Sequence, residues 1–175
     1  MKGILIKPEV WKGKQKALDK FGLAVTRRVI KPQPELSISD EVYKENLRKF
    51  KSLKTPYQVG ETVYIKEAFR YIQGGGEVHD FGVWYKLDGE YKWWRDNGGI
   101  MNYPINEKNR SPLFMPAWAA RHFIQITDVR AGDFFLPLIS PEELELEGGT
   151  AALDMLAQIS GKWVFRYEFE KVNRE

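Results

Sequence analysis

The chain contains no cysteine and only two histidines. The lack of cysteine excludes disulfides, thiol nucleophiles and thiolate metal sites. The histidines, His79 and His122, are far apart in the sequence, and neither belongs to a cluster with the spacing of metal ligands. A surface histidine beside Asp80 is a commoner arrangement than half of a metal site, so we expect no metal centre.

Several familiar motifs are missing as well. No G-x-S-x-G turn is present to hold a nucleophilic serine. The glycines at 74–76 lack the lysine and the strand-to-helix setting of a phosphate-binding loop. No stretch approaches the roughly 20 apolar residues of a membrane span, and the N-terminal apolar stretch is too short for a signal peptide. We therefore expect a soluble, cytoplasmic protein with no membrane partner and no cofactor.

The composition that remains is that of a globular protein rich in aromatic residues. A length of 175 residues suggests a single domain over 1–175, and 43% hydrophobic residues are enough for a core. Aromatic residues make up 14% of the chain, including six tryptophans, and they can fill a core, line a pocket or stack on bases. The net charge of +3 permits contact with nucleic acid but does not require it.

Apolar periodicity and turn residues predict a mixture of strands and helices. Strands are expected at 3–6, 24–30, 62–69, 123–129 and 162–172, a hairpin around Asp88-Gly89, and helices at 9–21, after Ser39, after Ser140 and at 150–159. No β-α-β alternation recurs, so the pattern favours an α+β fold, a small mixed β-barrel with helices on its outside. Two insertions are expected, a helical one near 36–56 and a hairpin with a long loop at 74–112.

The strand at 24–30 carries "TRR", which places Thr26 and Arg28 on one face and Arg27 on the other. In the simplest interpretation one face packs and both arginines are solvated. Alternatively, Arg27 or Arg28 lines a cleft, where a guanidinium can form forked hydrogen bonds with a phosphate or a base edge. The residues of this strand leave both interpretations open.

Two further features concern aromatic and acidic residues. The segment "YKWWR", which contains Trp94, offers ring planes beside cations, although a hairpin with one core and one rim tryptophan explains it equally well. Glu67 lies in a largely apolar strand, so it needs a partner if it is buried. An arginine from the neighbouring strand is the natural candidate.

Taken together, these motifs resemble one protein family. The segments "TRRVIKPQP", "PYQVGETVYIKEAF", "YKLDG", "SPLFMPAWAARHFIQITDVR", "LEGG" and "WVFRYEFEKV" occur in an order that is similar to ASCH-domain proteins, in particular to their phage- and prophage-encoded branch. The resemblance spans nearly the whole chain. It implies a PUA-like fold, a small and mostly β barrel with peripheral helices, in a domain class that typically binds RNA or modified bases.

The resemblance also assigns residues. The family threonine corresponds to Thr26 and its paired arginines to Arg27 and Arg28. The Lys-Glu of the next strand corresponds to Lys66 and Glu67, and the arginine after the Met-Pro motif to Arg121. The chain departs from the enzymatic relatives at Leu23, where those proteins carry a lysine that helps to activate the threonine hydroxyl. This replacement argues against catalysis.

The leading hypothesis is therefore a module that binds RNA, a nucleotide or a modified base. Thr26, Arg28 and Arg121 would supply hydrogen-bond donors, Glu67 would orient an arginine or accept from a base, and Trp94 or Trp118 would stack. One alternative is a hydrolase, acting on acylated nucleosides or on RNA, with Thr26 and Glu67 as its catalytic residues. Another is a phage accessory or counter-defence protein that binds a host protein through 74–112.

Overall fold

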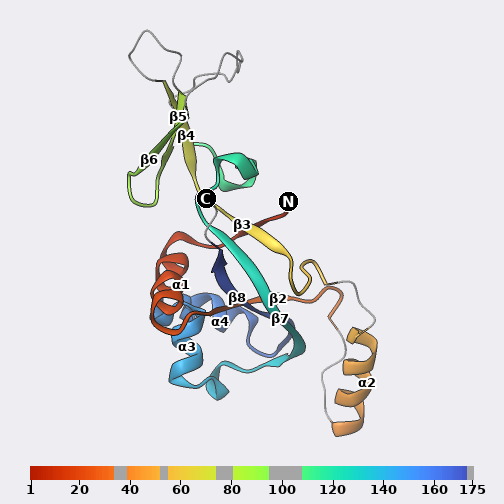
Figure 1. Cartoon of the computed structure of the whole chain (residues 1–175). Coiled ribbons are helices and arrows are strands. Elements are labelled where there is room, and N and C mark those ends of the chain that lie inside the picture. The colour runs from red at the N-terminus through yellow and green to blue at the C-terminus, as the bar shows by residue number, and fades with distance from the viewer. Residues whose placement is uncertain (34–38, 52–54, 74–80, 95–107, 173–175) are drawn as a thin grey trace. The chain divides into compact units, whose positions relative to one another are not determined.

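A computed structural model describes the chain except for residues 34–38, 52–54, 74–80, 95–107 and 173–175 (Figure 1). The fold is a mixed α+β fold, with four α-helices and two sheets in the described part. The helices are α1 (Pro8–Phe21), α2 (Asp40–Lys51), α3 (Pro141–Glu147) and α4 (Leu153–Ile159). The strands are β1 (Gly3–Leu5), β2 (Ala24–Val29), β3 (Thr62–Lys66), β4 (Phe69–Gln73), β5 (Phe81–Tyr85), β6 (Tyr91–Trp94), β7 (Phe123–Phe134) and β8 (Lys162–Val172). Short 3₁₀ turns are η1 (Pro112–Phe114), η2 (Ala117–Ala119), η3 (Leu136–Leu138) and η4 (Gly149–Ala152).

The chain divides into two units, which are described separately. The first unit comprises Met1–Pro8 and Tyr64–His122, and the second comprises Glu9–Val63 and Phe123–Glu175. The division falls within β3, whose first two residues belong to the second unit. The described strands contain no closed barrel, so the barrel expected from the sequence stays a prediction, as does the single domain over 1–175.

The second unit is built on an antiparallel sheet in which β8 lies between β2 and β7. The strand predicted at 162–172 is confirmed as β8, and its aromatic residues lie on one face. The side chains of this face are at most 6% exposed, and they are those of Trp163, Phe165, Tyr167 and Phe169. At the other edge of β7, the Gly60 N–H donates to the Ile126 carbonyl at 2.7 Å. The alternation along β8 thus places an aromatic layer on one face of the sheet, while Val25 and Val164 are buried on the other face.

The helix boundaries of the second unit follow sequence signals. The Ser140 hydroxyl accepts from the Glu143 N–H at 3.1 Å and begins α3, with Pro141 at the first helical position. Ser39 caps α2 in the same way, through the Val42 N–H. Gly22, at a φ of 76°, ends α1 as predicted, because a left-handed residue closes the last turn with little strain.

The first unit contains two strand groups. β1 pairs in parallel with the end of β3, and β4, β5 and β6 form an antiparallel sheet. The predicted hairpin around Asp88-Gly89 is confirmed, although five residues (86–90) rather than two connect its strands. Gly89 takes a φ of 79°, and the Tyr85 N–H donates to the Glu90 carbonyl at 2.8 Å. A longer turn therefore still keeps β5 and β6 in register.

The single strand predicted for 62–69 was wrong, because β3 ends at Lys66 and β4 begins at Phe69. The Glu67 N–H donates to the sulfur of Met115 at 3.1 Å, and the Ala68 carbonyl accepts from the Lys86 N–H at 3.0 Å. These two backbone groups bond outside the ladder of β3, so the strand cannot continue through them.

Some predicted features lie outside the described residues. They include parts of the insertion predicted at 74–112, namely 74–80, with its glycines and the His79-Asp80 pair, and 95–107. Among the helices that are described, none combines the length and the apolar character needed to cross a membrane.

Candidate functional site

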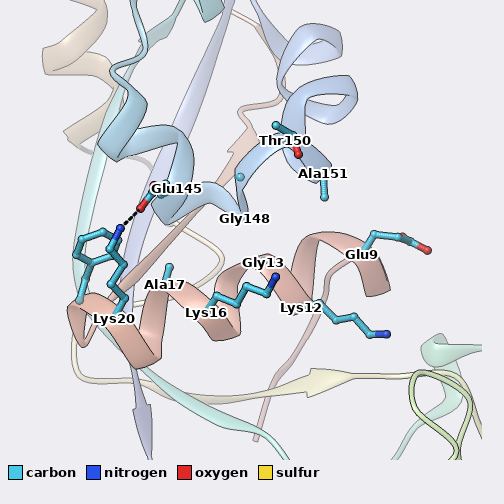
Figure 2. Close-up of a pocket in the computed structure, with 12 residues that line it drawn as sticks. Glu9, Lys12, Gly13, Lys16, Ala17, Lys20, Glu145, Gly148, Thr150 and Ala151 are labelled. Atoms are coloured by element: carbon cyan, nitrogen blue, oxygen red, sulfur yellow. Dashed lines mark hydrogen bonds and ion pairs between the residues drawn. The ribbon is translucent and has the colours of Figure 1, made fainter.

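A hollow of about 450 Å³ lies in the second unit, between α1 and the segment that joins α3 to α4 (Figure 2). We call it the lysine hollow. Its lining consists of Glu9, Lys12, Gly13, Lys16, Ala17, Lys20, Phe21, Glu145, Gly148, Gly149, Thr150 and Ala151. Sites for small ligands occupy about 300–1,000 Å³, so the hollow has room for a ligand of nucleotide size.

Three lysines recur at every fourth position along one side of α1. Each step advances about 6 Å along the helix, so Lys12, Lys16 and Lys20 form a row of positive charge. Lys20 donates to Glu145 at 2.7 Å, and this exposed pair contributes at most about 1 kcal/mol. Lys12 and Lys16 form no ion pair or hydrogen bond with residues that the structure describes. In Figure 2, Lys16 runs along the helix and Lys12 extends outward at the rim.

The opposite wall is mostly backbone, because it contains Gly148 and Gly149. Gly148 has a φ of 114° and Gly149 a φ of 68°, which lets the chain turn sharply from α3 into η4. The two walls come so close at Gly13 that a Cβ there would lie 2.0 Å from the Gly148 carbonyl oxygen. The glycine at position 13 therefore sets the separation between α1 and the end of α3.

A buried ion cluster, formed by Lys14, Arg27, Glu143 and Glu147, holds these walls in place. The fully buried Lys14 Nζ lies 3.3 Å from Glu147 Oε2 and also donates to the Val25 carbonyl. Arg27 donates to Glu147, and its Nη2 donates to Glu143 Oε1 at 2.5 Å. The carboxylates of α3 thus tie together α1 and β2.

The electrostatics of the buried ion cluster depend on this pairing. Burial lowers the pKa of Lys14 to about 8, although the neighbouring Glu147 carboxylate opposes the shift. Burial alone would raise the pKa of Glu143, but hydrogen bonding to Arg166 and the charge of Arg27 hold it below its usual value. The cluster consequently needs Glu147 to keep two buried cations compensated.

The predicted site residues of β2 do not line the lysine hollow. Arg27 is only 8% exposed, and its guanidinium is occupied by carboxylates of the protein itself and lies over the ring of Phe134. The interpretation with two solvated arginines was therefore wrong for this residue. Thr26 and Arg28 lie on the other face of β2, where Thr26 is 3% exposed and Arg28 is half-buried. Leu23 directly precedes the strand.

In the first unit, the structure brings Glu67 and Arg121 together. Arg121 donates to the buried Glu67 from Nε at 3.0 Å and from Nη2 at 2.8 Å. This confirms that Glu67 is buried with an arginine partner, although the arginine precedes β7 instead of lying in a strand. Arg121 also pairs with Asp88 at 2.7 Å and Glu90 at 2.9 Å. The arrangement links the end of β3 to the turn between β5 and β6.

Tyr85 completes this cluster. Its ring centroid lies 4.3 Å from the Arg121 guanidinium, and its hydroxyl donates to the Ala119 carbonyl at 2.7 Å. Burial raises the pKa of Tyr85, and ion pairing raises the pKa of Arg121 although its burial acts in the opposite direction. Both oxygens of Glu67 thus accept from Arg121, and the network connects residues of the first unit to one another.

The remaining predicted residues of the first unit are dispersed. Lys66 donates to the Leu113 carbonyl at 3.1 Å. Trp118 stacks on Tyr71, with ring centroids 6.0 Å apart. Trp94 is the last residue of β6, and its side chain lies outside the described part. These residues and those of β2 belong to different units.

Sequence reasoning did not single out the lysine hollow. The signal was present, because a K-x-x-x-K-x-x-x-K pattern runs through the predicted helix at 9–21, but only the apolar positions of this helix were used. Glu147 and Gly148 belong to the "LEGG" motif, which was not predicted to form part of a site.

Two observations bear on cofactors and relatives. Within the described ranges, no group of three or more histidine, aspartate or glutamate side chains is arranged to hold a metal ion. Comparison of the chain with protein-family models, with curated proteins and with solved structures gave no match. The resemblance to ASCH domains therefore stays a prediction.

Proposed function

We propose that this protein binds single-stranded RNA or a nucleotide, and that the lysine hollow holds the phosphates of the ligand. The observation that carries the proposal is the row of lysines on one wall of a hollow of nucleotide size. Lysine ammonium ions bind phosphates as compact point charges.

Further support comes from two cationic side chains outside the hollow, which already have partners. Arg27 and Arg121 are both paired with carboxylates, so binding a ligand phosphate would require each to give up an ion pair. Lys12 and Lys16 have no such competitor among the described residues. A phosphate that binds these two lysines would therefore break no ion pair or hydrogen bond with the described residues.

We also propose the finer fold and family assignment, an ASCH-type, PUA-like barrel of the phage or prophage branch. The order of the quoted motifs supports it, together with the mixed α+β fold. Hydrolysis with Thr26 and Glu67 is the weaker proposal. Thr26 is buried, both Glu67 oxygens accept from Arg121, and Leu23 stands where the enzymes carry lysine.

Fluorescence anisotropy with labelled oligouridine at low salt tests the binding proposal. We expect wild-type protein to bind, and Lys16→Glu to weaken binding about tenfold, since it removes a phosphate contact and adds repulsion. The matched control is Lys44→Glu, which reverses an exposed lysine on α2 outside the hollow. No binding by the wild type would contradict the function, and equal losses in both variants would contradict the site.

A further inference from the structure

The three-stranded sheet of the first unit carries a row of side chains that the lysine hollow does not explain. Arg70, Trp84 and Tyr91 are cross-strand partners in β4, β5 and β6. Because side chains directly opposite one another lie on the same face, these three form one row, which we call the β4–β6 row. The opposite face carries buried side chains, namely those of Phe69, Tyr71, Val83 and Tyr85.

The β4–β6 row combines one cation with two aromatic rings. The Arg70 guanidinium lies 4.4 Å from the centroid of the Trp84 ring, in cation–π contact. Tyr91 is 61% exposed, the largest exposure of any described aromatic ring in this unit except that of Phe114. The row thus ends in an aromatic plane that a ligand can reach.

Arg70 differs from Arg121 of the same unit. Arg121 is held by carboxylates, whereas Arg70 makes no ion pair with residues in the described part, and its buried Nε has no acceptor there. The contact with Trp84 restricts where the guanidinium lies, and its side chain forms no hydrogen bond with the described residues. A fixed cation beside an exposed ring suits a ligand that combines negative charge with a planar base.

We propose that the β4–β6 row is a second contact surface for single-stranded nucleic acid, in which Tyr91 stacks on a base and Arg70 binds a neighbouring phosphate. This inference rests on the ligand class of the proposed function but not on the lysine hollow. Base stacking on an aromatic side chain tolerates any sequence. The row therefore adds affinity for oligonucleotides without adding specificity for a particular base.

The test compares two variants at Tyr91 in the same anisotropy titration. Tyr91→Leu keeps an apolar side chain but removes the ring, and we expect oligouridine binding to weaken about fivefold or more. Tyr91→Phe keeps the ring and is expected to bind within about twofold of the wild type. Tyr91 is exposed, so both variants should fold, which thermal melting checks. The inhibition constant of tripolyphosphate, which has phosphates but no base, should be the same for all three proteins.

A second variant, Arg70→Gln, tests the phosphate contact independently. It should weaken binding and reduce the slope of log affinity against log salt by about 0.7, the value for one phosphate contact with a single strand. Equal affinity of Tyr91→Leu and wild type, with Lys16→Glu weakened, would overturn this inference and leave the proposed function standing. Loss in Tyr91→Leu but not in Lys16→Glu would support the row and contradict the hollow. Wild-type binding to acidic peptide or anionic vesicles, but not to RNA, would overturn both.

Discussion

Replacing Glu147 by glutamine is expected to lower the free energy of unfolding by about 3–5 kcal/mol, the usual cost of leaving a buried charge without its partner. The Glu147 carboxylate compensates both Lys14 and Arg27, and its side chain is fully buried. Glutamine fills nearly the same volume as glutamate, so the loss of stability measures the effect of the missing charge and not that of a cavity. Urea denaturation at neutral pH measures it.

The matched control is Glu145→Gln, two residues earlier in α3. Glu145 pairs with Lys20 at the surface, where both side chains are more than half exposed, so we expect a change below about 1 kcal/mol. The loss of unfolding free energy in Glu147→Gln should also shrink as the pH rises through about 8. Lys14 then loses its proton, so it no longer needs the Glu147 carboxylate as a counter-charge. A deficit as small as that of the control would contradict the buried ion cluster.

Gly13→Ala should destabilise the protein by about 1–3 kcal/mol, the usual range for overpacking. In the interior of an ordinary helix the same change is stabilising by up to about 1 kcal/mol, because alanine has the higher helix propensity. Here the sign is reversed, since the new Cβ would lie 2.0 Å from the Gly148 carbonyl oxygen, a backbone atom that no side-chain rotation can move. Thermal or urea denaturation shows directly whether the free energy of unfolding falls or rises.

Lys12→Ala provides the comparison on the same helix. Its side chain is exposed at the rim of the lysine hollow, so its stability should change by no more than about 0.5 kcal/mol. Because Gly13→Ala pushes the two walls apart, it should also alter affinity for oligouridine. An increase in stability on Gly13→Ala would show that α1 and Gly148 are not in contact.

Much of the fold could be predicted because its signals are local. The alternation along β8 needs only the side-chain period of a strand, and Ser140 and Gly22 mark helix ends through the bonds and backbone angles of a few neighbouring residues. The hairpin between β5 and β6 was equally visible, since Asp88-Gly89 interrupts two alternating runs.

What could not be predicted depends on residues distant in the sequence. Arg27 is buried because Glu147, 120 residues further along the chain, supplies its counter-charge. The strand at 62–69 breaks because Met115 and Lys86 take the hydrogen bonds of Glu67 and Ala68. No periodicity within 62–69 contains this information.

The candidate site also combines a local signal with contacts between residues that are distant in the sequence. The spacing of Lys12, Lys16 and Lys20 is visible in the sequence, but whether it marks a solvated helix face or the wall of a site depends on the opposite wall. That wall exists because α3 ends at Gly148 close to Gly13. Thr26 and Glu67, by contrast, were predicted to contact a ligand, yet both are buried.

Backbone amide chemical-shift mapping of isotope-labelled protein, titrated with oligouridine, tests the central claim most directly. If the lysine hollow binds the phosphates, the amides of Gly13, Lys16 and 149–151 should show large, saturable shifts, while those around Lys44 on α2 should not move. Saturable binding with shifts confined to other parts of the chain, and none at 149–151, would contradict the account.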